Sequence, residues 1–171
     1  MKDGVLEQID GAWQLRFERR LAHDPARVWR ALTRPEELAA WFPTTIEGSL
    51  RPGSPLRFNF ADQPLEGFDG EVIAADENRL LEFVWGEDRL RISLAPEDGG
   101  TRLTLIDVLD DRGKGARDGA GWHVCLDNLE ALLDDTAPPA SDAWKSLNES
   151  YQERFGPEAS TIGPPEGVVT A

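Results

Sequence analysis

The segment Gly115–Asp134 places the strongest constraint on what this chain can fold into. Its apolar side chains recur at intervals that predict an amphipathic helix of about five turns with one buried face. Segments of strand type precede it, and a helix laid across one face of an antiparallel sheet would bury the apolar faces of both. Four glycines at its start leave no side chain between helix and sheet, so we expect a pocket there. The apolar positions are Trp122, Cys125, Leu126, Leu129, Leu132 and Leu133, and the glycines are Gly113, Gly115, Gly119 and Gly121.

The residues before this helix predict a strand, two short helices and a meander of strands. Residues 13–21 alternate apolar and polar side chains, which is typical of a half-buried strand. Asp24 followed by Pro25 predicts a helix start, and Thr33 with Glu36 resembles a capping box for a second short helix. Short loops rich in turn residues separate the later strands, as in antiparallel neighbours. We expect these strands near Ile46 and at residues 56–60, 67–74, 79–85, 89–95 and 101–109.

The two ends of the chain lie outside the main domain, which we assign to residues 13–135. Residues 1–12 form an N-terminal extension. Residues 136–156 comprise a linker and an appended amphipathic helix, because Trp144, Leu147, Tyr151 and Phe155 follow helical spacing up to a Gly-Pro stop. Residues 157–171 are rich in glycine and proline, and we expect a disordered tail.

Composition and charge exclude several classes of partner. With 171 residues and 40% apolar side chains, one domain is expected. The net charge is −14, and residues 61–111 hold 14 acidic and 4 basic side chains. Such a surface repels nucleic acid and anionic lipid, so we expect no nucleic-acid partner and no membrane insertion. A lone cysteine and the lack of a signal peptide favour a cytoplasmic protein.

Residues 14–57 carry the opposite charge, with eight arginines against five acids. A protein partner that docks through this charged surface is one interpretation, and a solvated face of mixed charge is the other. The appended helix leaves both a monomer and a homodimer open.

Three motifs resemble a known superfamily. Residues 24–38 read DPARVWRALTRPEEL and are followed by Trp41 and Phe42, residues 80–85 read LLEFVW, and Gly121-Trp122 opens the leucine-rich helix. Together they resemble the SRPBCC (START-like) superfamily, most closely its heat-shock protein 90 ATPase-activator homologue-like branch. The resemblance implies an α+β helix-grip fold, in which a curved antiparallel sheet wraps around a long C-terminal helix and encloses a hydrophobic cavity. The superfamily includes carriers, cyclases and chaperone co-activators, so the fold alone does not fix an activity.

Six residues are candidates for ligand binding in such a cavity. Aromatic side chains suit a flat apolar ligand. Asp107 continues the apolar face of Leu103 and Leu105, so a desolvated carboxyl with a raised pKa is expected there unless the strand frays and leaves it in solvent. His123 follows Trp122 at the glycine-rich start of the helix, although it lies off the apolar stripe. The candidates are Trp41, Phe60, Trp85, Asp107, Trp122 and His123.

The leading functional hypothesis is non-enzymatic binding of a small hydrophobic or aromatic molecule. A co-chaperone-like interaction module is one alternative, and a cyclase or dehydratase that uses Asp107 or His123 is another. The chain has no phosphate-binding glycine loop, nucleophile elbow or HExxH motif, which argues against an autonomous hydrolase or nucleotide enzyme. Two distant histidines with no nearby carboxylate pattern do not make a metal site, and a single cysteine excludes a cysteine-based zinc cluster, so no metal site and no cofactor are expected.

Overall fold

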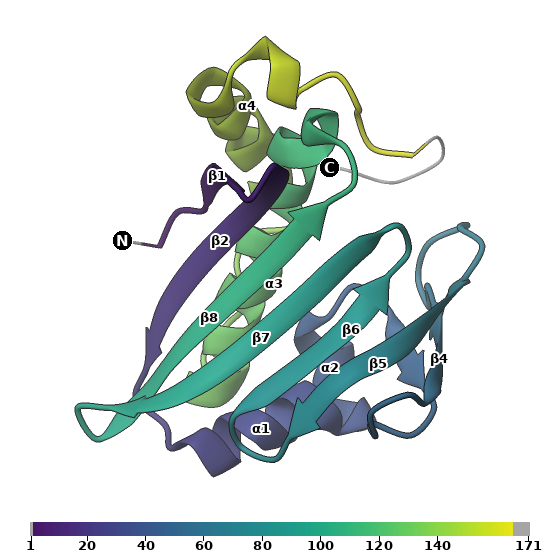
Figure 1. The fold of residues 1–171 in the computed structure, drawn as a ribbon. Helices are drawn as coiled ribbons and strands as arrows, with labels where there is room; N and C mark the ends of the chain where they lie inside the picture. Colours follow the sequence, from purple (N-terminus) through teal and green to yellow (C-terminus); the bar gives the residue numbers. More distant parts are fainter. Residues whose placement is uncertain (1, 166–171) are drawn as a thin grey trace.

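An eight-stranded antiparallel sheet forms one layer of the protein, and helices cover one of its faces (Figure 1). The structure is a computed structural model and describes residues 2–165. The strand order in the sheet is β1-β2-β8-β7-β6-β5-β4-β3. The strands are β1 Val5–Ile9, β2 Ala12–Leu21, β3 Thr45–Glu47, β4 Pro55–Asn59, β5 Phe68–Asp76, β6 Leu80–Trp85, β7 Asp88–Glu97 and β8 Gly100–Leu109. The α-helices are α1 Pro25–Thr33, α2 Pro35–Trp41, α3 Gly115–Asp134 and α4 Ala143–Phe155.

Alternation along the central strands produces the buried face of the sheet. In the ladder, Phe17 pairs with Leu105, Leu105 with Ile92, and Ile92 with Leu81. Each of these four side chains is at most 2% exposed, so they form one apolar row across four strands. Cross-strand neighbours of this kind are the unit from which sheet stability is built.

The helix α3 lies across this apolar face, and α1 and α2 lie beside it on the same face (Figure 1). It spans Gly115–Asp134 as predicted. The C-cap residue is Asp135, whose left-handed backbone (φ 52°) ends the helix. The predicted start of α1 is also confirmed, because the Asp24 carboxylate accepts a hydrogen bond from the Arg27 N–H and Pro25 follows it. The chain therefore has the expected α+β helix-grip fold.

The predicted capping box of α2 is wrong. Arg34 occupies the N-cap position and makes no side-chain capping bond. The Thr33 hydroxyl instead donates to the Trp29 carbonyl inside α1, at 2.8 Å. The Pro35 that follows Arg34 suits the first position of a helix and accounts for the start of α2 without a side-chain cap.

Both ends of the chain contribute more to the fold than the sequence suggested. The N-terminal extension contains β1, which pairs with β2 at the edge of the sheet. The helix α4 packs on the N-terminal half of α3, where Tyr151 is only 1% exposed. The expectation of a disordered tail is wrong for residues 157–165, because a short 3₁₀ helix, Pro157–Ala159, buries Ala159 completely and Ile162 bonds to Gly113. Residues 166–171 of that predicted tail lie outside the described residues.

Candidate functional site

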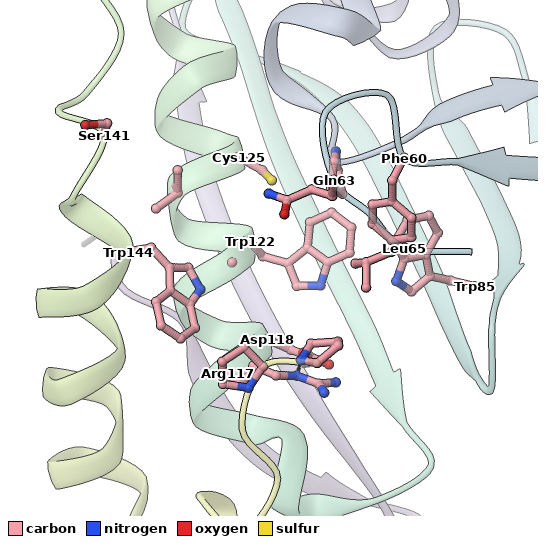
Figure 2. A pocket seen from close by; sticks show the side chains of 15 residues that line it. Phe60, Gln63, Leu65, Trp85, Arg117, Asp118, Trp122, Cys125, Ser141 and Trp144 are labelled. Atoms are coloured by element: carbon pink, nitrogen blue, oxygen red, sulfur yellow. Dashed lines mark hydrogen bonds and ion pairs between the residues drawn. The ribbon is translucent and has the colours of Figure 1, made fainter. Parts of the chain in front are cut away.

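A cavity of about 440 Å³ lies beside the N-terminal half of α3. Figure 2 shows Trp122 of α3 near its centre, with Trp85 at the end of β6 and Phe60 and Leu65 of the loop after β4 on one side, and Trp144 of α4 on the other. The lining is thus largely apolar and aromatic. It also includes residues that lie far apart in the chain, from Pro43 to Pro165.

The polar end of the cavity is formed by Arg117 and Asp118, at the start of α3 (Figure 2). The Arg117 Nε donates to Asp118 Oδ1 at 2.6 Å, so the two charges are paired. Gln63 lines the cavity as well. A ligand here would meet rings over most of its surface, with the Arg117–Asp118 pair and Gln63 on opposite sides of Trp122 (Figure 2).

Only one of the four glycines opens onto this cavity. A Cβ built at Gly121 would have no atom within 4 Å, and Gly121 lines the cavity. The other three are filled by the chain itself: Gly119 faces Tyr151 and Phe155 of α4, Gly115 faces Leu6 and Ala159, and Gly113 faces Thr161 and Ile162. The expected gap at all four is therefore wrong for Gly113, Gly115 and Gly119.

Asp107 lies directly behind the cavity wall. Its Oδ2 accepts a hydrogen bond of 2.8 Å from the Trp122 indole Nε1, and its Oδ1 has no hydrogen-bond partner among residues 2–165. The side chain is 1% exposed because β8 continues to Leu109 without fraying. Burial raises the pKa of Asp107 well above its ordinary value, and the negative charges of Asp118 and Asp88 raise it further.

Two neighbouring carboxylates accompany Asp107. One oxygen each of Asp88, Asp107 and Asp118 lies within 4.8 Å of the others. The Lys114 ammonium lies 3.1 Å from Asp88 Oδ1 and also contacts Asp110. That contact holds the pKa of Asp110 down to about 2, while burial raises the pKa of Asp88.

The six candidate residues do not all reach the cavity. Phe60, Trp85 and Trp122 line it, and Asp107 supports Trp122 from behind. Trp41 lies elsewhere in the core, where its Nε1 donates to the Ala31 carbonyl. His123, 7% exposed, is also not among the lining residues.

His123 belongs to a buried network between α3 and α4. Its Nδ1 lies 2.8 Å from the Tyr151 hydroxyl, which accepts a hydrogen bond from the Gly4 N–H at 2.7 Å. Beside this network, Arg19 of β2 donates to Asp127 Oδ1 at 2.8 Å and to the Lys2 carbonyl at 3.1 Å. Together these bonds hold the N-terminal segment, β2 and α4 to α3.

Several residues that line the cavity were not predicted to do so from the sequence. Trp144 was assigned to the appended helix, and Pro164 and Pro165 to the tail. The apolar face of α4 was visible as a periodicity, but its position against the cavity was not. Cys125 lines the cavity too, and burial raises the pKa of its thiol to about 12, which keeps it protonated.

Comparison with protein families identifies the family of this chain. A family model described as "Activator of Hsp90 ATPase homolog 1-like protein" matches residues 22–134. This chain belongs to that family. The matched region of the Hsp90-activator-homologue-like chain ends with α3, so α4, Trp144 and the prolines of the cavity wall lie beyond it.

Solved structures of other proteins share this fold. EF2215 of Enterococcus faecalis, a conserved protein of unknown function, has a TM-score of 0.76 at 21% identity, covering 89% of this chain and 90% of its own. CalU16 of Micromonospora echinospora has a TM-score of 0.69 at 21% identity, covering 90% and 97%. The protein encoded by gene BPP1335 of Bordetella parapertussis has a TM-score of 0.67 at 27% identity, covering 89% of each chain.

A search of curated protein sequences returned no significant match. No helix within residues 2–165 combines the length and apolar character needed to cross a membrane.

Proposed function

We propose that this Hsp90-activator-homologue-like protein binds a small hydrophobic molecule with a flat, aromatic body in the cavity beside α3. The cavity of about 440 Å³, walled by three tryptophans, is the observation that supports this function. Ligand sites in proteins are typically concavities of roughly 300–1,000 Å³ with mostly apolar walls and a few polar groups that fix orientation.

The arrangement of the rings favours a flat ligand. Trp85 and Trp122 lie 5.7 Å apart between ring centroids and are tilted by 57°, so both belong to one aromatic wall. Trp144 lines the cavity from α4, on the other side of Trp122 (Figure 2). A planar ligand between these walls gains dispersion and ring-to-ring contacts in addition to apolar burial. Arg117 and Asp118 would orient its polar end.

Titration of tryptophan fluorescence with a panel of aromatic and fatty molecules tests this function. We expect saturable quenching by aromatic ligands, because three of the six tryptophans line the cavity. Trp144→Leu should weaken binding about tenfold through lost ring contact. Trp29→Leu is the matched control, because Trp29 is a partly buried helix tryptophan that does not line the cavity. No saturable response from any ligand, or equal loss in both variants, would refute the proposed function.

A protein-interaction module of co-chaperone type is the second candidate, favoured by the family description. The charge pattern supports it less than the sequence suggested. Five of the eight arginines in residues 14–57 form ion pairs with acids of the same chain, which are Arg16, Arg19, Arg20, Arg27 and Arg57. A pull-down with an Hsp90 at low and high salt tests this candidate, since electrostatic docking weakens with salt.

A further inference from the structure

Two buried carboxylates, Asp88 and Asp107, converge with the half-buried Asp118 beside the polar end of the cavity. Asp88 begins β7, Asp107 lies near the end of β8, and Asp118 lies in the first turn of α3. One oxygen of each lies within 4.8 Å of the other two. Asp88 and Asp107 are at most 6% exposed, so this is an interior cluster and not a patch of surface acids.

A protein donor holds each carboxylate through one of its two oxygens. The Asp110 N–H and Lys114 Nζ donate to Asp88 Oδ1, at 2.9 and 3.1 Å. Arg117 Nε donates to Asp118 Oδ1 at 2.6 Å. Trp122 Nε1 donates to Asp107 Oδ2 at 2.8 Å. Outer donors of this kind orient carboxylates that bind a metal ion.

The unpartnered oxygen of Asp107 is an independent sign that a group is bound here. Asp107 Oδ1 is shielded from solvent and accepts no hydrogen bond from the described part of the chain. A buried carboxylate oxygen without a partner carries a desolvation cost that a bound cation would remove.

The local charges leave the cluster short of positive charge. With all side chains ionised, Asp88, Asp107, Asp118 and the adjoining Asp110 carry four negative charges. Lys114 and Arg117, which pair with them, supply two positive charges. Glu87, which adjoins Asp110, adds a further negative charge. A bound cation would offset part of this excess of negative charge.

We propose that Asp88, Asp107 and Asp118 bind a hard divalent cation such as Ca²⁺, Mg²⁺ or Mn²⁺. Such ions prefer oxygen ligands at about 2.0–2.6 Å, so two ligand oxygens on opposite sides of the ion lie up to about 5 Å apart. The oxygen separations in the cluster fall within that limit. An all-carboxylate set suits these ions better than zinc or copper, which favour nitrogen and sulfur.

This proposal departs from the expectation of no metal site, which rested on histidine and cysteine ligands. The three aspartates Asp88, Asp107 and Asp118 are far apart in the sequence and become adjacent only after folding. Because Asp118 also lines the apolar cavity, the cation would lie next to the polar end of a bound ligand. The cation site does not depend on the ligand-binding proposal and is tested without a ligand.

Calorimetric titration and thermal unfolding of the chelator-stripped full chain test the site with Ca²⁺, Mg²⁺ and Mn²⁺ added separately. We expect saturable binding of one ion per chain and a rise in the unfolding temperature that grows with ion concentration. Asp107→Asn should weaken binding at least about tenfold, because it removes one ligand charge. In chelator alone, the same substitution should raise the unfolding temperature, because it removes a buried charge while its amide oxygen still accepts from Trp122.

Asp62→Asn is the matched control, since Asp62 is an exposed carboxylate on a chain of net charge −14. It should bind the cation as the wild type does. Equal affinity of wild type and Asp107→Asn would mean adventitious binding to surface acids and would overturn the proposal. So would the lack of saturable binding of any of the three ions, which would mean that a proton on Asp107 neutralises the cluster instead.

Discussion

Glycine at two neighbouring positions of α3 serves two different purposes. A Cβ at Gly119 would lie 3.3 Å from Phe155 Cε2 and 3.5 Å from Tyr151 Cγ, so this glycine allows α4 to approach. A Cβ at Gly121 would have nothing within 4 Å, so this glycine enlarges the cavity. Glycine thus allows close helix packing at position 119 and leaves open space in the cavity at position 121.

This difference predicts that alanine at the two positions changes the free energy of unfolding differently. Gly121→Ala should raise the free energy of unfolding by about 0.5–1 kcal/mol, because alanine restricts the unfolded chain and meets no obstacle in the helix. Gly119→Ala should gain less or lose stability, since α4 must shift to admit the methyl group. Urea unfolding of both variants measures the effect. Equal gains would contradict the close packing of α4 at Gly119.

The junction of α3, α4 and the N-terminal segment depends on a neutral histidine. The Tyr151 hydroxyl accepts from the Gly4 N–H, so it is free to donate its proton to an unprotonated His123 Nδ1. Burial lowers the pKa of His123, and the positive charges of Arg19 and Lys2 lower it further. The carboxylates of Asp127 and Asp3 act in the opposite direction, but burial is the largest cause.

This junction predicts a loss of stability in weak acid. Because the folded pKa of His123 is lowered, the unfolded chain binds the proton first as the pH falls below about 6.5. The free energy of unfolding should therefore decrease between pH 7 and pH 5, and less so in His123→Asn, whose amide oxygen still accepts from Tyr151. Urea unfolding across this pH range measures the difference. Identical pH profiles of wild type and His123→Asn would refute the role of His123.

Elements with a strong local period were predictable, and contacts between distant segments were not. The helix α3 matched its predicted bounds because its apolar stripe is set by local spacing. The strand β1 was missed because VLEQI is short and half exposed, and only its pairing with β2 reveals it. The alternation on β8 placed Asp107 inside, yet its neighbours Asp88 and Asp118 come from other elements.

The cavity was predicted only in part, because local periodicity identifies buried faces but not the contacts between distant segments. Trp85 and Trp122 belong to elements whose buried faces were clear, and both line the cavity. Trp41 is also a tryptophan on a predicted element, but it packs inside the core, where it is 2% exposed. Residue type alone does not distinguish a core ring from a cavity ring. Trp144 and Pro164 reach the cavity only when the chain returns across α3.

At the scale of the whole molecule, the family region supplies the sheet and α3, and the residues after 134 complete the cavity. The bonds that hold the segment after Ala159 include a backbone hydrogen bond from the Ile162 N–H to the Gly113 carbonyl at 3.1 Å. They also include a bond from the Arg117 side chain, whose Nη1 donates to the Gly163 carbonyl at 3.3 Å. The segment places Pro164 and Pro165 on the cavity wall. This wall is therefore separable from the rest of the fold.

A chain that ends at Ala159 should stay folded but bind the cavity ligand more weakly. The buried Ala159 and the whole of α4 remain, so the cooperative unfolding transition should be retained. Losing about 50 Å² of apolar contact with the two prolines costs about 1.3 kcal/mol, close to tenfold in affinity. Fluorescence titration with the best ligand of the panel measures the loss, and a chain that ends at residue 165 is the control, because it keeps both Pro164 and Pro165. Equal affinity of the two shortened chains would show that the prolines do not contact the ligand, and the bound molecule would then have to lie against α3 and the aromatic residues Phe60 and Trp85.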